Sequence, residues 1–212
     1  LDCQRVAGPY AAEPGDMGRR ALRNLALGYL MELDDSALQL RVLAQFRDAD
    51  NMTDQFAALA ALANVNAADC PERETALADF YVRWQHEALV VDKWLAAQST
   101  SRRPDTLATV QALTKHPAFD IANPNKVYAL LRAFGGNLVR FHSAGGYAFV
   151  ADCVLQLHDR NPQVASRLAR SFDRWKKFDG ERQRHARAAL ERIRDHAGLS
   201  RDVLEVVTRA LG

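Results

Sequence analysis

Apolar residues recur along the chain with the period of an α-helix. The first clear stripe consists of residues at helical spacing: Leu22, Leu25, Ala26, Tyr29, Leu30 and Leu33. Comparable stripes lie in seven later stretches: 52–63, 77–84, 127–134, 150–157, 165–172, 186–193 and 203–211. This spacing predicts amphipathic helices, each with one apolar face turned to a core. No long segment alternates with a period of two, so strands are not needed to explain any of them.

Proline and glycine mark where these helices begin and end. All seven prolines lie between the apolar stripes or at their starts. Asn123-Pro124 and Asn161-Pro162 are each typical of an N-cap followed by proline at the first helical position. There the asparagine side chain accepts from free backbone N–H groups, and the fixed φ of proline suits the first turn. We therefore predict about a dozen helices of roughly 10–16 residues, joined by short links.

Short links place consecutive helices antiparallel to each other, and a dozen helices are too many for one bundle core. The sequence therefore predicts an all-α fold, a superhelical stack of antiparallel helix pairs. Residues 1–16 are predicted to be a linker or tail from a preceding domain, and residues 17–212 a single helical-repeat domain. No strict repeat is visible, so any repeats have diverged.

The composition is that of a globular protein, with 48% hydrophobic and 25% charged residues in 212. No apolar run approaches the roughly 20 residues that span a bilayer, and no signal peptide is visible. Three widely spaced cysteines form no C-x-x-C pair, which favours a reducing, cytoplasmic location. Because the chain begins with Leu1 rather than Met, we expect it to be part of a longer protein.

Motifs that carry catalysis are missing from the sequence. No two of the six histidines are three or four residues apart, so no H-E-x-x-H zinc motif is present. Neither a G-x-G-x-x-G nor a G-x-x-x-x-G-K-[ST] nor a G-x-S-x-G motif occurs. We expect no catalytic residue, metal site or cofactor within this chain.

The most uneven charge lies in residues 160–194, where eleven Lys and Arg residues oppose four Asp and Glu residues. Nucleic-acid binding is one interpretation of this segment. However, Phe172, Trp175 and Phe178 are spaced like a buried stripe rather than like stacking platforms. A solvated helix face beside an acidic partner domain is therefore favoured, and a nucleic-acid partner is not expected.

The start of the second Asn-Pro helix offers a more specific candidate site. Gln163 and Arg167 lie one turn apart on one face, close to a predicted helix N-terminus that favours carboxylates and carbonyl oxygens. Arginine could hold a peptide backbone or a C-terminal carboxylate in bidentate fashion. The alternative is an ordinary helix cap beside a surface arginine.

Seven short segments, in order, carry a resemblance to a known family: Arg19-Arg20-Ala21-Leu22-Arg23-Asn24, Asn51-Met52-Thr53-Asp54, Asp92-Lys93-Trp94 followed by Gln98, Asn123-Pro124-Asn125-Lys126, Phe141-His142, Gly146-Tyr147 and Asn161-Pro162-Gln163-Val164-Ala165-Ser166-Arg167-Leu168. From about Arg19 onward, the chain resembles the C-terminal domain of the aminopeptidase N family of bacterial zinc metallo-aminopeptidases (gluzincins). Each segment alone is weak, but all of them in order are specific.

The resemblance implies a function for a longer parent protein. The parent would remove N-terminal amino acids from peptides, and its zinc ligands and general base would lie in a preceding thermolysin-like catalytic domain. This chain would be an armadillo- or HEAT-like helical stack that closes the active-site chamber. Its partners would be the catalytic domain of the same chain and peptide substrates, with no membrane. The isolated chain is predicted to be inactive.

The resemblance also implies substrate-binding residues. On matching positions these are Gln163 and Arg167, together with Asn125, Lys126 and Tyr128 from the other Asn-Pro helix. Tyr128 departs from the family pattern, because some relatives have a basic residue there. The glycine segment near 145 is shorter than in relatives, so the loop 141–147 is expected to differ in shape. A free-standing helical-repeat scaffold that binds a protein partner is the alternative from another functional class.

Overall fold

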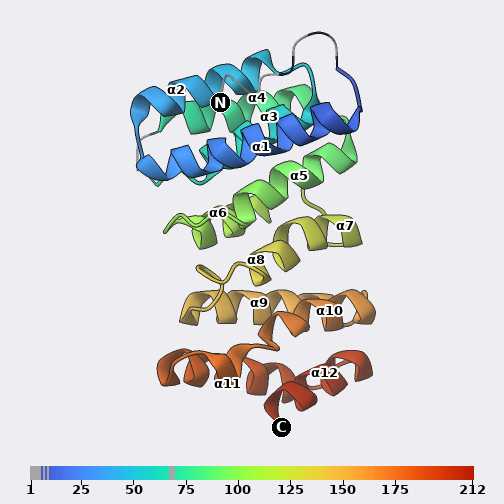
Figure 1. Ribbon diagram of the computed structural model, residues 1–212. Coiled ribbons are helices and arrows are strands. Elements are labelled where there is room, and N and C mark those ends of the chain that lie inside the picture. The colour runs from blue at the N-terminus through green and yellow to red at the C-terminus, as the bar shows by residue number, and fades with distance from the viewer. Residues whose placement is uncertain (1–5, 7, 9, 67–69) are drawn as a thin grey trace. The chain divides into compact units, whose positions relative to one another are not determined.

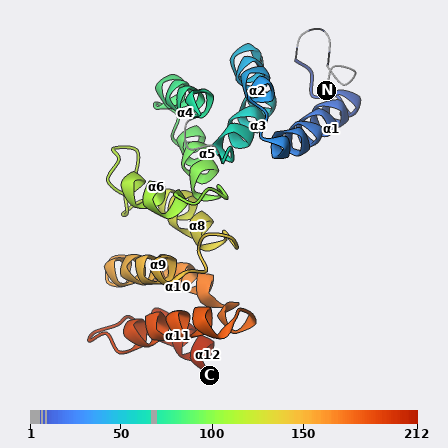
Figure 2. The same ribbon diagram turned by 90° about the vertical axis from the view of Figure 1, so that its left-hand side faces the viewer.

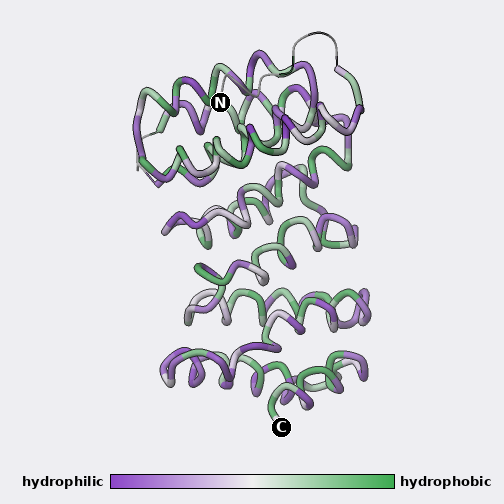
Figure 3. Tube along the Cα trace, viewed as in Figure 1, coloured by the Kyte–Doolittle hydropathy of each residue, from purple (hydrophilic) through white to green (hydrophobic). Residues whose placement is uncertain are grey.

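The computed structural model describes residues 6, 8, 10–66 and 70–212 (Figure 1). Within these ranges all regular structure is helical and no strand occurs, so the all-α prediction is confirmed. None of the helices in the described ranges is long and apolar enough to cross a membrane. The helices form two compact units, Leu1–Gln85 and His86–Gly212. The helices of both units contain polar as well as apolar residues, as amphipathic helices require (Figure 3).

The first unit is built on the packing of two helices, α2 and α3, with α1 and α4 against α3. Its elements are α1 (Pro14–Leu30), the 3-10 turn η2 (Met31–Leu33), α2 (Ser36–Asp48), α3 (Met52–Ala63) and α4 (Pro71–Trp84). Aromatic residues from different helices meet in its core, where the Phe46 and Phe80 ring centroids are 6.4 Å apart. Leu59 and Leu62 of α3 are completely buried beside them. This core therefore lies between α2, α3 and α4.

The second unit is a succession of helical layers. Its elements are α5 (Ala88–Ser99), α6 (Thr106–Leu113), α7 (Pro124–Val127), the π-helical turn η3 (Tyr128–Arg132), α8 (Ala133–Gly135), α9 (Ala144–Leu157), α10 (Pro162–Ala169), the 3-10 turns η4 (Arg170–Phe172) and η5 (Trp175–Lys177), α11 (Gly180–Arg194) and α12 (Arg201–Leu211). Its layers follow one another in chain order (Figures 1 and 2). Helix α9 packs on α10 and α11, and α12 packs on α10 and α11. This is the stack of helix pairs that the sequence predicts.

Aromatic packing holds the middle of the second unit together. The Phe141 ring meets Phe134, Tyr147 and Phe172 edge-on, with ring centroids 5.2–6.1 Å apart. Such edge-to-face pairs place positive ring edges against negative ring faces and are favourable beyond their buried area. All four rings are completely buried. The apolar stripes predicted at 127–134, 150–157 and 165–172 supply most of this core, and their burial confirms that part of the helix prediction.

The predicted helix starts are confirmed at both Asn-Pro pairs. The side chain of Asn123 accepts a hydrogen bond from the N–H of Asn125, and that of Asn161 accepts one from the N–H of Val164. In each case proline occupies the first turn, where a missing N–H leaves no intrahelical hydrogen bond unmade. These caps fix the beginnings of α7 and α10, the two helices that carry the candidate site.

Two boundaries differ from the sequence expectation. Helix α1 begins at Pro14, inside the segment 1–16 that was predicted to be a linker. Proline at the first helical position explains this earlier start. Residues 1–5, 7 and 9 of that segment lie outside the described residues. The range 17–212, predicted to be a single helical-repeat domain, spans parts of both compact units.

The prediction of which α1 face is buried is wrong. Four large residues of the predicted stripe are exposed: Leu22 by 52%, Leu25 by 59%, Tyr29 by 72% and Leu33 by 68%. Leu27, on the opposite side of the helix, is buried instead. The reason is that polar side chains of α1 find partners on α3, so its polar face points inward. Helical periodicity identified the stripe correctly but not the side that the rest of the unit would cover.

Candidate functional site

The candidate site combines residues of two helices that are far apart in sequence. Tyr128 begins the π-helical turn after α7, and Arg167 lies on α10. The Nη1 of Arg167 donates a hydrogen bond of 2.9 Å to the Tyr128 hydroxyl. Asn125 precedes Tyr128 by three residues and Gln163 precedes Arg167 by four, so each shares a helical face with its neighbour. We call Asn125, Tyr128, Gln163 and Arg167 the Tyr128–Arg167 cluster.

The cluster presents polar groups to solvent. Asn125, Gln163 and Arg167 are exposed, and Tyr128 is half-buried. Among the described residues, the guanidinium of Arg167 bonds to the Tyr128 hydroxyl and meets no carboxylate. A neutral hydroxyl orients the guanidinium without neutralising its charge. The remaining N–H donors of Arg167 are therefore suited to an external carboxylate or carbonyl oxygen.

Unlike Arg167, several arginines of the basic segment 160–194 form ion pairs. Five of them pair with carboxylates: Arg170 with Asp173, Arg182 with Asp179, Arg187 with Glu191, Arg192 with Asp152 and Arg194 with Asp195. Carboxylates that accept from an arginine compete with phosphate for the same donors. This pairing is typical of a solvated helix face; the acidic partner domain expected beside it stays a prediction.

One member of the cluster, Tyr128, belongs to a π-helical turn. Residues Tyr128–Arg132 form this turn between α7 and α8, in place of a continuous α-helix. Single π-turns within α-helices are rare and occur often at functional sites, because they change the direction in which side chains project. Here the turn begins at Tyr128 itself, while Leu130 and Leu131 remain buried in the core. The apolar periodicity of 127–134 gave no sign of this turn.

Arg167 lies farther from the N-terminus of α10 than the sequence predicts. The sequence placed Gln163 and Arg167 near one helix N-terminus. However, α10 is only eight residues long and ends at Ala169, because the chain tightens into the 3-10 turn Arg170–Phe172. Arg167 therefore lies in the last turn of α10, and only Gln163 lies in the first. The N-terminal partial charge of α10 can act on a ligand near Gln163 but not on one near Arg167.

Lys126 lies apart from the other predicted site residues. Its side chain is buried, and its Nζ donates to the carbonyl oxygen of Ala88 at 2.9 Å and to Asp92 Oδ1 at 2.7 Å. The ammonium group therefore ties α7 to α5. In this arrangement Lys126 fixes the helix that carries Asn125 and Tyr128.

The Phe141–Tyr147 segment, at the start of α9, is buried at its two ends. His142 and Tyr147 are buried, and His142 Nδ1 lies 2.9 Å from the Tyr147 hydroxyl. Burial, helped by the positive charge of Arg182, lowers the pKa of His142 to about 4, so its imidazole is neutral at physiological pH. Burial likewise raises the pKa of the Tyr147 phenol to about 12. The ring of His142 also stacks on Phe178, with centroids 3.7 Å apart. These two residues act in packing.

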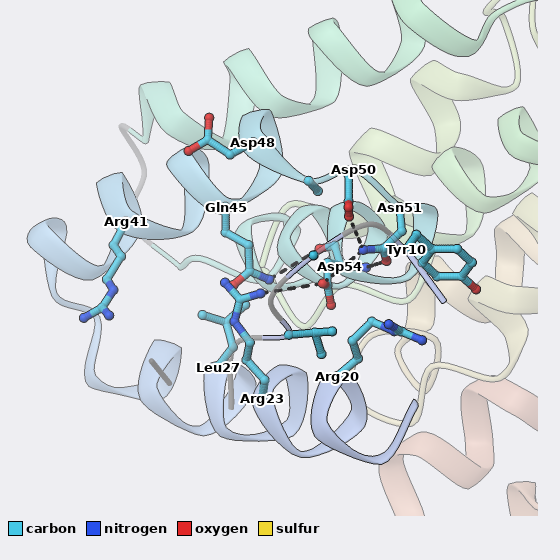
Figure 4. Close-up of a pocket in the computed structure, with 13 residues that line it drawn as sticks. Tyr10, Arg20, Arg23, Leu27, Arg41, Gln45, Asp48, Asp50, Asn51 and Asp54 are labelled. Carbon is cyan, nitrogen blue, oxygen red and sulfur yellow. Dashed lines mark hydrogen bonds and ion pairs between the residues drawn. The ribbon is translucent and has the colours of Figure 1, made fainter. Parts of the chain in front are cut away.

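The first unit contains a polar pocket that the sequence did not predict (Figure 4). This pocket of about 480 Å³ includes Arg20, Arg23, Gln45 and Asp54 in its lining. Asp54 accepts from Asn24 at 2.8 Å and lies 3.6 Å from the Arg23 guanidinium. The sequence did contain a sign of this pocket, because Arg20, Arg23 and Asn24 of α1 lie on the helical side away from the apolar stripe. Two segments that carry the family resemblance, 19–24 and 51–54, meet here.

The part of the chain that the structure describes contains no group of three or more His, Cys, Asp or Glu side chains that could hold a metal ion. Zinc requires three protein ligands in a catalytic site and four in a structural site. The residues present do not fit a zinc centre, and no chemical step through zinc is assigned to this chain.

Comparison with known proteins defines the family. A family model described as "Domain of unknown function (DUF3458_C) ARM repeats" matches residues 2–212. The chain belongs to this family of ARM-repeat domains. Its all-helical layered architecture agrees with that description, and the resemblance drawn from the sequence segments is confirmed.

Individual relatives are bacterial aminopeptidases. The chain is 40% identical to aminopeptidase N of Escherichia coli (strain K12) over 205 residues, which cover 95% of this chain and 23% of that protein. It is also 40% identical to aminopeptidase N of Caulobacter vibrioides over 212 residues, covering 98% of this chain and 24% of the relative. The solved structure of Legionella pneumophila aminopeptidase A in complex with aspartic acid matches with a TM-score of 0.88 at 33% identity, covering 98% of this chain and 25% of that one.

The chain thus spans about a quarter of the length of the relatives it matches. Those relatives are peptide hydrolases, and the match falls only in their C-terminal part. This ARM-repeat chain therefore corresponds to the C-terminal part of those relatives.

Proposed function

We propose that this ARM-repeat domain forms part of the wall of an active-site chamber in a zinc aminopeptidase and contacts the peptide substrate through the Tyr128–Arg167 cluster. The zinc ion and the residues that activate water would belong to the preceding part of the parent enzyme. The domain itself would supply binding and orientation. Its contribution to the rate would come from holding the peptide rather than from chemistry.

The observation that carries this proposal is the state of Arg167. Its guanidinium is exposed, is oriented by a neutral hydroxyl and meets no carboxylate among the described residues. A peptide offers oxygens that such a group recognises, namely backbone carbonyls and the C-terminal carboxylate. Gln163 and Asn125 add amide groups that can both donate to and accept from a peptide backbone.

Three of the predicted residues would play different parts. Arg167 would bind a substrate oxygen, and Tyr128 would hold the guanidinium in position through the 2.9 Å hydrogen bond. Lys126 would act indirectly, because its bonds to Ala88 and Asp92 fix α7. At position 128, where some family members have a basic residue, the tyrosine would orient Arg167.

The test is a comparison of substrates in the intact parent enzyme. Arg167→Ala should raise KM for tripeptides and longer peptides by roughly 10- to 100-fold, the value of one or two charge-assisted hydrogen bonds. KM for alanyl-para-nitroanilide should change little, because that substrate does not extend far from the cleaved bond. kcat should change less than KM, since the interaction is present in both the ground and the transition state.

Two further variants make the test specific. Tyr128→Phe keeps the ring and removes only the hydroxyl, and should raise KM for long peptides by roughly two- to tenfold. Arg174→Ala removes another exposed arginine of the same unit and is the matched control, with no expected change. An equal effect of Arg167→Ala on both classes of substrate would exclude the peptide-binding role.

A second experiment tests where the chemistry lies. The 212-residue chain with added zinc should not hydrolyse alanyl-para-nitroanilide. Adding it to the separately expressed remainder of the parent should restore activity or peptide selectivity. Hydrolysis by this chain alone would contradict the proposal.

A further inference from the structure

The outward face of α1 is a continuous apolar strip. Leu22, Leu25, Tyr29 and Leu33 lie within one stripe at helical spacing, and each exposes more than half of its surface. We call these four residues, of which Leu33 lies in the turn η2 directly after the helix, the outer face of α1. Single exposed leucines are ordinary on protein surfaces, but a contiguous strip of large apolar residues marks an interaction site.

Helix α1 cannot turn this strip inward, because its opposite face is held by specific polar contacts. Asn24 Nδ2 donates to Asp54 Oδ1 at 2.8 Å, and Arg23 lies 3.6 Å from Asp54 Oδ2. Gln45 Nε2 in turn donates to Asn24 Oδ1 at 3.2 Å. Rotating the helix would separate these partners and leave buried polar groups unpaired. The outer face is therefore a fixed feature of the first unit.

The segment that leads into α1 is also held against this helix. Arg20 Nη2 donates to the carbonyl oxygen of Ala11 at 2.7 Å, and the Arg20 guanidinium lies 4.7 Å from the centre of the Tyr10 ring. Tyr10 and Ala11, which precede α1, therefore lie beside this helix. In the relatives, the region matched by this chain is the C-terminal part of a protein about four times as long.

We propose that the outer face of α1 is the docking surface for the preceding part of the same polypeptide. This inference rests on the proposed function only in that the chain is a domain of a longer aminopeptidase. Covalent connection next to α1 gives the preceding part an effective concentration in the millimolar range, far above that of a second copy of the chain. The complementary surface should be apolar, with a hydrogen-bonding group near the Tyr29 hydroxyl, since aromatic residues with a polar tip are favoured at such interfaces.

Cysteine accessibility tests this surface in the parent enzyme. Leu25→Cys and Tyr29→Cys are introduced separately into the parent and into the 212-residue chain, and maleimide labelling of the peptide that contains each cysteine is followed by mass spectrometry. Both positions should label roughly tenfold or more slowly in the parent, because labelling there requires local opening of the interface. Val82→Cys on α4 replaces another exposed apolar residue of the first unit and should label at the same rate in both proteins.

Each other outcome overturns the proposal in a distinct way. Equal rates in parent and isolated chain would show that the outer face stays open. Slow labelling in the isolated chain at every protein concentration would show that the chain itself covers the face. Slow labelling that appears only at high concentration would identify a second copy as the occupant.

A disruptive variant provides an independent readout. Leu25→Asp should lower the thermal unfolding temperature of the parent but leave that of the isolated chain unchanged, because an exposed position tolerates a charge. Equal effects in both proteins would contradict docking. Neither readout uses catalytic activity, so a failure of the docking proposal can be distinguished from a failure of Arg167 to affect KM.

Discussion

Helices α1 and α9 each carry an apolar stripe, and the two stripes are used in opposite ways. In α9 the apolar stripe of Val150, Val154 and Leu157 is buried in the core of the second unit. In α1 the apolar stripe faces away from α3, and the polar side of the helix is buried against it. The difference lies in what each helix meets: aromatic and aliphatic side chains around α9, but the carboxylate and amide groups of Asp54 and Gln45 around α1.

This contrast shows why hydrophobic periodicity alone is an ambiguous guide to burial. An amphipathic helix has two faces that can each be covered, one by apolar groups and one by hydrogen-bonding partners. Helix α9 buries its apolar stripe within its own compact unit. By our proposal, α1 lies between two parts of a longer protein and buries its polar face in one and its apolar face in the other.

The largest expected effect separates the two stripes directly. Leu157→Ala in α9 should lower the free energy of unfolding of the 212-residue chain by about 3 kcal/mol, since it removes a completely enclosed side chain and leaves a cavity. Leu25→Ala in α1 should change it by less than about 0.5 kcal/mol, because that side chain is already exposed. Urea unfolding of both variants checks this, and equal losses would show that the outer face of α1 is covered within the chain.

The buried pair of His142 and Tyr147 at the start of α9 predicts a pH effect on stability. Burial lowers the folded-state pKa of His142 from 6.5 to about 4, so between these values the unfolded chain binds a proton that the folded chain does not. The contribution of His142 to the free energy of unfolding is therefore greatest above pH 6.5. The free energy of unfolding falls by up to about 3 kcal/mol as the pH drops toward 4. Thermal unfolding between pH 4 and 7 measures this.

His142→Gln should flatten the dependence in that window while keeping a polar group near Tyr147. The matched control is His86→Gln, which replaces an exposed histidine. If the slope of His142→Gln equals that of the unchanged chain, the titrating group lies elsewhere.

A smaller effect tests the polar network behind α1. Asp54→Ala should cost about 2 kcal/mol, because Arg23 and Asn24 would lose a shared, largely buried acceptor. Asp54→Asn, which retains one acceptor oxygen, should cost less. Asp48→Ala on α2 removes an exposed carboxylate and should be nearly neutral. Chemical denaturation of the three variants gives the order, and a cost for Asp48→Ala equal to that for Asp54→Ala would contradict the network.

Much of the fold follows from local sequence signals. The caps at Asn123 and Asn161, the helices that follow them and the buried stripes of the second unit all depend on residues within one or two turns of each other. Two exposed members of the candidate site, Gln163 and Arg167, could also be chosen from their spacing on α10. The contact between Arg167 and Tyr128 could not, because it joins residues 39 positions apart on different helices.

The sequence by itself determined the helical class of this protein, where the two Asn-Pro helices begin, which residues share a face and to which family the chain belongs. The tertiary structure decided which face of α1 is buried, that Lys126 serves α5 rather than the exposed cluster, and that a π-turn begins at Tyr128. The physical reason is that helical periodicity fixes how side chains are arranged around one axis. What lies across from each face depends on partners brought together only by the packing of distant helices.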